Sequence, residues 1–353
     1  MVCVNRRIKT LAWGAIPLVA LASLVSIDHI PGTDISLTVP YAAEGPGPTF
    51  NTLGEVDGVE VVEITGTETD EVEGNLNMTT VSVRTGMTLS QALSRWLFTD
   101  DTIVPIEQIF PPGRSPEEIR ESNTMAFAAS EASATIAAMN FLNLPVEIEV
   151  YDVVEDSAAA GILEPGDAVS SVNGTAVTTP GEVQELIRGM APGDEVTITY
   201  RRGGEEKTAT VPLGAHPQDD SVPLLGISMT SVPVSDTEVT YNLEDIGGPS
   251  AGLMFSLAVV DKLSPGPLNG GRFVAGSGTI AEDGSVGPIG GITHKVRAAE
   301  EAGAEIFLAP TANCAEAVTA DYGDMTILQV DTLEHAIEQM DAYNSGGGYQ
   351  TCD

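Results

Sequence analysis

The chain has 353 residues, enough for two or three domains that each hold a proper core. Its 51 acidic and 15 basic residues give a formal net charge of −36. This argues strongly against nucleic acid as a partner, because phosphate binding needs Lys and Arg. The acidity is best read as favouring solubility.

An apolar segment, residues 11–27, lies near the N-terminus and carries no charge over 17 residues. This is just long enough for a membrane span. Arg6, Arg7 and Lys9 precede it and acidic residues follow, which predicts an N-terminus inside the cell and a body outside. A cleaved signal peptide is the alternative, but no Ala-x-Ala site lies at the right distance. We therefore expect residues 1–30 to be a retained transmembrane anchor in the cell membrane.

Residues 31–143 are predicted to form a scaffold segment that packs with the last domain. Residues 44–56 are rich in turn-forming residues, and residues 59–64 and 78–83 alternate like strands. Residues 87–96 and 116–142 are predicted to be helices, the second beginning with the N-terminal signature Ser-Pro-Glu-Glu. No recognisable active constellation stands in this segment.

Residues 144–215 change in character, with strands, a helix at 180–189 and a Gly-Gly hairpin in close succession. The run from Gly161 to Asp167, GILEPGD, together with Val172-Asn173-Gly174, resembles a PDZ domain. The resemblance implies a β-rich module that binds peptides beside a sheet edge. No GLGF-type carboxylate-binding loop is evident. A spacer that binds nothing is the alternative.

The stretch at residues 247–252, GGPSAG, delivers Ser250 to the first turn of an apolar helix. Unpaired N–H groups and the positive end of the helix dipole would stabilise an oxyanion formed there. Ser250 is therefore a candidate nucleophile, although serine is also a common helix cap.

A nucleophilic serine needs a base, and three of the four histidines are poorly placed: His29 lies near the apolar segment, His216 in a linker and His335 on a later helix. A lysine can serve if a dry site lowers its pKa. Lys207 lies on a polar hairpin, and Lys262 stands twelve residues along the Ser250 helix, about 18 Å away. Lys295 remains, among small and apolar residues. His294 beside it cannot face the serine together with Lys295, since helix neighbours point about 100° apart.

The pair GGPSAG and PIGGITHK, with Ser250 and Lys295 forty-five positions apart, closely resembles the proteolytic domain of Lon-type serine peptidases. The resemblance implies that Ser250 is the nucleophile and Lys295 the general base. It aligns Ser277 with a threonine that supports the lysine, and Gly248 and Ala251 flank the nucleophile as supporting positions. Gly247 departs from the family, which usually has an acidic residue there.

The order of apolar segment, PDZ-like module and Lon-like domain is similar to the membrane-anchored, YlbL-type proteins of Gram-positive bacteria. It implies an α/β (α+β) proteolytic domain over residues 222–343, followed by a flexible tail at 344–353. We expect a serine endopeptidase that works without ATP, because no G-x-x-x-x-G-K-[ST] motif occurs. Its substrates would be unstructured or partly unfolded extracytoplasmic proteins or peptides. No metal or other cofactor is implied, and Lon domains suggest a homo-oligomeric ring. The alternatives are an inactive, membrane-tethered PDZ adaptor and a hydrolase of small esters or amides.

Three cysteines bear on the compartment. With Cys3 on the cytoplasmic side, Cys314 and Cys352 would both be outside the cell, where a disulfide can persist. We hypothesise that these two pair and tie down the C-terminal tail; two free thiols are the alternative.

Overall fold

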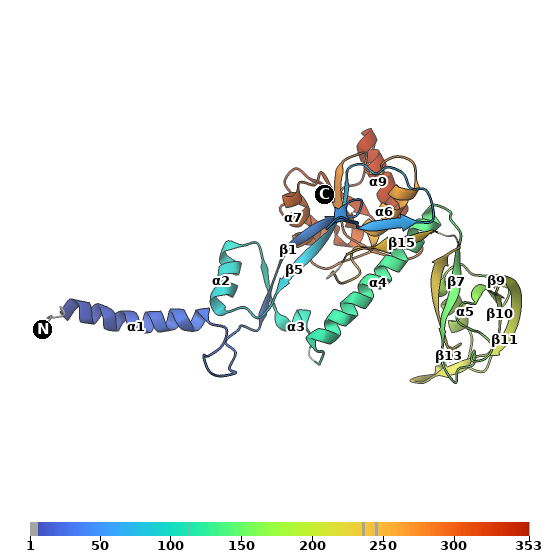
Figure 1. The fold of residues 1–353 in the computed structure, drawn as a ribbon, viewed down its shortest axis with the longest axis horizontal. Helices are drawn as coiled ribbons and strands as arrows, with labels where there is room; N and C mark the ends of the chain where they lie inside the picture. The colour runs from blue at the N-terminus through green and yellow to red at the C-terminus, as the bar shows by residue number, and fades with distance from the viewer. Residues whose placement is uncertain (1–5, 112, 235–236, 244–245, 353) are drawn as a thin grey trace.

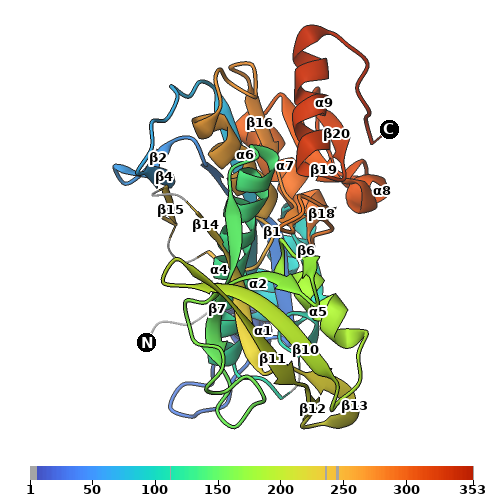
Figure 2. The same cartoon turned by 90° about the vertical axis from the view of Figure 1, so that its right-hand side faces the viewer.

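The computed structural model describes residues 6–111, 113–234, 237–243 and 246–352. Helix α1 (Arg6–Ser26) projects from one side of a mixed α/β body, and a β-rich module lies on the other side (Figure 1). The view turned by 90° shows the same body above the module, with the long helix α4 (Pro116–Phe141) running between them (Figure 2). The chain thus divides into a body and a module joined by α4.

The body is built on a six-stranded sheet in the order β20-β19-β16-β5-β1-β6. In chain order its strands are β1 (Tyr41–Asn51), β5 (Asn75–Arg84), β6 (Thr102–Pro105), β16 (Phe273–Gly276), β19 (Ile306–Pro310) and β20 (Thr326–Val330). The last three strands run parallel to β5, whereas β1 is antiparallel to both of its neighbours. The segment expected to be scaffold therefore supplies half of the sheet that carries the C-terminal domain.

Helices cover both faces of this sheet. α4, α6 (Gly252–Leu263) and α9 (Leu333–Ser345) share one apolar core with the sheet, and α7 (Ile292–Ala302) and α8 (Cys314–Ala317) share the other. Successive side chains of a strand point to opposite faces. In β19, Ile306 and Leu308 accordingly join the first core, and Phe307 and Ala309 join the second. Because β19 is buried on both faces, its sequence, IFLAP, is a continuous apolar run.

The expected helix at 116–142 is confirmed as α4. Ser115 caps it in a reciprocal capping box with Glu118, and Pro116 stands at the first helical position. Its 26 residues span about 39 Å at the helical rise of 1.5 Å. This length lets α4 reach from the module to the far side of the body.

The β module, residues 146–233, has its own sheet and core. The sheet order is β11-β10-β8-β7-β14, with β9 paired to β8. The elements are β7 (Val146–Val153), β8 (Ala168–Val172), β9 (Thr175–Ala176), α5 (Pro180–Arg188), β10 (Glu195–Arg202), β11 (Glu205–Pro212) and β14 (Ile227–Pro233). Because β14 pairs along β7, the module continues past the expected limit at residue 215.

The remaining elements are short. They are β2 (Glu55–Val56), β3 (Val59–Glu60), β4 (Val62–Thr65), α2 (Leu89–Phe98), α3 (Ile106–Ile109), β12 (Gly214–His216), β13 (Asp219–Leu224), β15 (Glu238–Tyr241), β17 (Thr279–Ile280), β18 (Val286–Gly287) and a 3-10 turn at Thr311–Asn313. β15 pairs with β4, which brings the chain leaving the module back to the body.

Much of the stretch at residues 44–56, which is rich in turn-forming residues, lies in a strand. Residues 41–51 form β1, and the Pro-Gly-Pro run appears as a register shift between Pro46 and Thr49 in its pairing with β5. A Cβ on Gly47 would lie 2.4 Å from Thr80 Oγ1, so only glycine lets the two strands approach this closely. A bulge thus accommodates the turn-forming residues within the strand.

The C-terminal tail, expected to be flexible apart from a link through Cys352, is attached to the body. Cys314 and Cys352 form a disulfide with an S–S distance of 2.02 Å, and Thr351 makes a β-bridge with Leu328 at the edge of the sheet. The Cys352 N–H also donates to the Ile327 carbonyl. Cys3 lies outside the described residues.

The expected membrane anchor corresponds to α1. In the described part of the chain, no helix combines the length and the hydropathy that a membrane span needs.

Candidate active site

The serine loop, residues 246–251, stands between β15 and α6. α6 is buried along almost its whole length, so it holds the end of this loop firmly. Gly248 has φ +90°, a conformation that favours glycine, and Ser250 follows two residues later at the mouth of a hollow. The sequence thereby places a half-buried hydroxyl immediately before the first turn of a rigid helix.

Lys295 comes from the opposite side of the sheet, from the first turn of α7. Gly291, directly before α7, has φ +66°, and a Cβ on it would lie 2.7 Å from the Val81 side chain of β5. The glycine therefore lets α7 begin in contact with the central sheet. Lys295 is only 3% exposed as a result.

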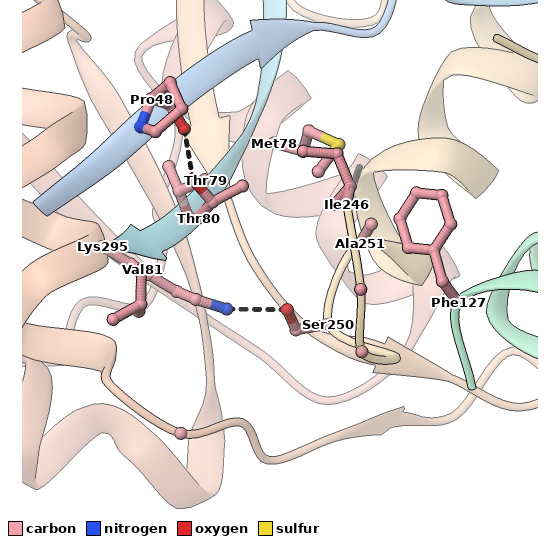
Figure 3. A pocket seen from close by; sticks show the side chains of 13 residues that line it. Pro48, Met78, Thr79, Thr80, Val81, Phe127, Ile246, Ser250, Ala251 and Lys295 are labelled. Carbon is pink, nitrogen blue, oxygen red and sulfur yellow. Dashed lines mark hydrogen bonds between the residues drawn. The ribbon is translucent and has the colours of Figure 1, made fainter. Parts of the chain in front are cut away.

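The structure brings three of the predicted site residues together. Lys295 Nζ donates to Ser250 Oγ at 2.7 Å and to Ser277 Oγ at 2.9 Å (Figure 3 shows the first contact). Ser277 stands between β16 and β17, and its hydroxyl in turn donates to the Ser250 carbonyl at 3.0 Å. Ser277 is 1% exposed, so this network is shielded from water.

The burial of Lys295 has an electrostatic consequence. Desolvation penalises the ammonium form and lowers the pKa of Lys295 to about 8. The amine is then partly neutral near neutral pH, and a neutral amine can accept the Ser250 hydroxyl proton. The amine and the hydroxyl thus lie within hydrogen-bond distance, the geometry that a base and a nucleophile would need.

A hollow of about 380 Å³ opens beside the two side chains (Figure 3). Met78, Phe127 and Ile246 give it an apolar side, and Thr79 and Thr80 of β5 give it polar groups. The hollow borders both Ser250 and Lys295, so it can hold the part of a substrate next to the bond under attack.

The other candidate bases lie elsewhere. Lys262 is buried in an ion pair with Glu60 at 2.6 Å and also donates to the Val62 carbonyl. His335 contacts Asp331, and burial lowers the pKa of His294, whose surrounding charges include Glu44 and Asp101. Within the described residues, no group of three or more His, Cys, Asp and Glu is arranged to hold a metal.

Residues of α4 form one side of the site, which the sequence interpretation missed. The Gly248 N–H donates to the Asn123 carbonyl at 2.9 Å, and a Cβ on Gly247 would lie 2.9 Å from Asn123 Cβ. Phe127, one turn later, lines the hollow and meets Phe255 of α6 edge to face. Position 247, which carries no side chain here, is thus approached by a residue from a distant helix. Nothing local in the α4 sequence marks this contact.

A second hollow, of about 400 Å³, lies in the β module between α5 and β14. Val183 and Ile187 of α5 face Leu225, Gly226 and Ile227 across it. β14 is the last strand of its sheet, which leaves one edge for another strand. The run Leu-Leu-Gly-Ile at 224–227 is the local sequence signal for this groove, and it lies beyond residues 144–215, the expected bounds of the PDZ-like module.

Comparisons with known proteins match these two parts separately. The family model for the Lon protease (S16) C-terminal proteolytic domain matches residues 244–340, and the PDZ domain model matches residues 122–213. The chain is a PDZ-containing, Lon-like protein. The Lon-type match contains both Ser250 and Lys295, and the PDZ match covers α4 from residue 122 and the β module as far as β11.

Individual relatives agree with this composition. An archaeal Lon protease of Methanothermobacter thermautotrophicus is 26% identical over 56% of this chain and 31% of its own length. Lon protease 2 of Bacillus subtilis is 30% identical over 30% of this chain and 19% of its own length. A probable periplasmic serine endoprotease, DegP-like, of Hahella chejuensis is 31% identical over 32% and 23%. The chain spans less than a third of the length of these relatives.

Among solved structures, the PDZ domain of an SdrC-like protein from Listeria monocytogenes is 28% identical. The match covers 24% of this chain and 86% of that chain, with a TM-score of 0.22.

Proposed function

We propose that this protein is an ATP-independent serine endopeptidase whose catalytic residues are Ser250 and Lys295. The observation that carries the proposal is the 2.7 Å contact between the Ser250 hydroxyl and the amine of Lys295, whose side chain is almost completely buried. A lysine buried beside a serine at a helix start is an arrangement suited to acyl transfer.

The reaction begins when neutral Lys295 accepts the Ser250 proton and Ser250 Oγ attacks the peptide carbonyl carbon. Backbone N–H groups at the start of α6, that of Ser250 among them, stabilise the oxyanion. The lysine then returns the proton to the leaving amine, which breaks the C–N bond and leaves an acyl-serine. Water, deprotonated by the same amine, hydrolyses the ester. Ser277 accepts a hydrogen bond from the ammonium form at 2.9 Å and so orients it.

The expected substrates are unstructured or partly unfolded protein segments. The hollow beside Ser250 is open on one side and has room for side chains rather than for a folded domain. The sequence has no Walker-type phosphate loop, and this supports cleavage that does not depend on ATP. The groove between α5 and β14 offers a second place for an extended peptide, with β14 as the pairing edge.

The test compares casein hydrolysis by wild type, Ser250→Ala and Lys295→Met. Both variants should lose activity by several thousand-fold while circular dichroism shows an unchanged fold. Lys207→Met, which removes an exposed lysine of β11, is the matched control and should keep full activity. Near-wild-type turnover in either site variant would refute the dyad.

An inactive PDZ adaptor is the competing function from another class. A serine-reactive phosphonate should label Ser250 in wild type, and labelling should vanish in Lys295→Met because the base is gone. An adaptor without activity should not react in either form. Cleavage of small esters but not of casein would favour the third reading, a hydrolase of small esters or amides.

We also propose that α1 anchors the protein in the cell membrane and that the proteolytic domain faces the extracytoplasmic side. The uncharged stretch at 11–27 with its basic N-terminal flank supports this placement, as does the Cys314–Cys352 disulfide. Helix α2, which contacts α1, also displays the exposed side chains of Trp96 and Phe98. Resistance to carbonate extraction, together with digestion by protease added to protoplasts, tests it; a freely soluble protein would contradict it. Mass photometry in detergent tests the predicted ring.

A further inference from the structure

We propose that Ser130 of α4 is a positioning residue for the oxyanion-binding N–H of the serine loop. The inference rests on the proposed peptidase function and adds a role to a residue outside the Lon-type segment. It starts from the way in which α4 contacts residues 247–250.

Three residues of α4 touch the serine loop and the start of α6 from a single helix face. Asn123, Phe127 and Ser130 stand at positions i, i+4 and i+7 of α4. The Asn123 carbonyl accepts from the Gly248 N–H, Phe127 packs against Phe255, and Ser130 Oγ donates to the Pro249 carbonyl at 3.0 Å. One face of α4 therefore contacts two consecutive residues of the serine loop and the first turn of α6.

The hydrogen bond of Ser130 differs from those that Ser and Thr side chains usually make inside helices. Such side chains usually donate to a carbonyl one turn earlier in their own helix. Thr124 and Thr135 of α4 do so, to Arg120 and Glu131. Ser130 instead donates across to the serine loop, and its side chain is buried. A buried hydroxyl aimed at a carbonyl of another segment fixes that carbonyl.

The carbonyl that Ser130 fixes belongs to the same peptide unit as the Ser250 N–H. A trans peptide is planar, so its C=O and N–H point in opposite directions. With the Pro249 oxygen held against α4, the Ser250 N–H must point away from α4. The next peptide unit is held independently, because the Ser250 carbonyl accepts from Ser277 Oγ and from the Gly278 N–H, both at 3.0 Å. The two peptide planes that flank the Ser250 Cα are therefore each fixed by side chains or backbone outside the loop.

This arrangement gives Ser130 a role in the transition state. Stabilisation of an oxyanion depends on donors that are already aimed where the charge develops. If the Pro249–Ser250 peptide plane can rotate, the Ser250 N–H no longer points at the developing oxyanion, while Ser250 Oγ and Lys295 Nζ stay in contact. Ser130 should then matter for kcat and not for substrate binding.

The experiment compares Ser130→Ala with wild type on a fluorogenic peptide. We expect kcat to fall about 10-fold, less than the 10²–10³-fold typical of losing an oxyanion donor outright. KM should stay within about twofold, and the pKa in the pH profile should not move, because Lys295 contacts Ser250 and Ser277 only through their own hydroxyls. The Ki of a peptide aldehyde, whose serine adduct carries the oxyanion, should rise by the same factor as kcat falls.

Thr124→Val on the same helix removes a hydroxyl that contacts only α4 and is the matched control. Ser130→Cys keeps nearly the same volume but donates weakly, so it should repeat the loss and can be read if the alanine variant does not fold. If Ser250→Ala is inactive, an unchanged kcat and an unchanged aldehyde Ki in both Ser130→Ala and Ser130→Cys would overturn this inference and leave the proposed function standing. A rise in KM by the same factor as the fall in kcat, with an unchanged ratio of aldehyde Ki to KM, would show that Ser130 has a merely structural role. This result would also overturn the inference. Activity in Ser250→Ala would remove the proposed function and this inference together.

Discussion

The pKa of Lys295 should respond to a charge placed at Ser277. The Ser277 hydroxyl lies 2.9 Å from Lys295 Nζ, and both side chains are almost completely buried. A carboxylate introduced by Ser277→Asp would stabilise the ammonium and raise the pKa of Lys295 above its present value of about 8. The activity of a lysine base would then move to higher pH.

The size of the shift follows from the geometry. Two unit charges about 3 Å apart interact by about 5 kcal/mol at an effective dielectric constant of 20. Desolvation of the new carboxylate opposes part of this, so we expect a rise of at least about 2 pH units. At pH 8 this leaves about one amine in a hundred neutral, against about half in the wild type, a fall of roughly 50-fold in kcat/KM.

The assay is kcat/KM against pH between 6 and 11 for wild type, Ser277→Asp and Ser277→Asn. Wild-type activity should rise with pH through about 8, because the neutral amine is the active form. Ser277→Asn has the same shape as the aspartate without its charge and should leave the midpoint near that of wild type. Equal midpoints for the Asp and Asn variants would show that the titrating group is not Lys295.

Three further predictions concern stability. Burial raises the pKa of Glu131 to about 7, so the folded state binds this proton more tightly than the unfolded state, and stability falls as pH rises from about 4.5 to 7. Glu131→Gln should raise the free energy of unfolding by about 1–2 kcal/mol at pH 8, after allowance for partial exposure, and change little at pH 4; equal effects at both pH values in urea titrations would contradict this. Cys352→Ser opens a crosslink between residues separated by 38 positions and should cost about 4 kcal/mol in the chain-entropy model, with dithiothreitol destabilising wild type but not the variant. Arg202→Met leaves Asp167, which is 0% exposed, without its partner at 2.6 Å, and should destabilise the PDZ domain by about 3–5 kcal/mol; unchanged hydrogen exchange in β10 would argue against it.

The contact between Ser250 and Lys295 could be predicted from the sequence because the residues of both motifs indicate the local backbone conformation. Gly248 and Gly291 have positive φ, two residues before Ser250 and four residues before Lys295, and a helix follows each of them. Elimination among four lysines then left one candidate for the base. These are local signals, and local signals are what a single sequence displays.

The contributions of α4 and β1 could not be predicted in the same way. Asn123 and Ser130 are ordinary polar residues in an Ala-rich helix, and they gain significance only because the chain returns to them more than one hundred positions later. In β1 the turn-forming residues 46–48 produce a bulge, since pairing on both sides with β5 and β6 outweighs their local preference. Contacts between distant parts of the chain therefore determine the role of α4 and the conformation of β1.

The PDZ domain is inserted at a point where the serine loop is held from both sides. The chain enters it at the end of α4, whose Asn123 and Ser130 bind the loop, and leaves it through β14 toward β15, after which the loop begins. α4 continues as one unbroken helix up to Phe141, and four residues separate it from the start of β7. A change in the position of the PDZ domain must therefore either bend this helix or be taken up by the four residues 142–145. Because the Leu144 N–H is bonded to the Met139 carbonyl and Val234 to that of Pro145, even this connection is partly fixed. The connection between the two domains is short on the α4 side, which is the side that determines the aim of the Ser250 N–H.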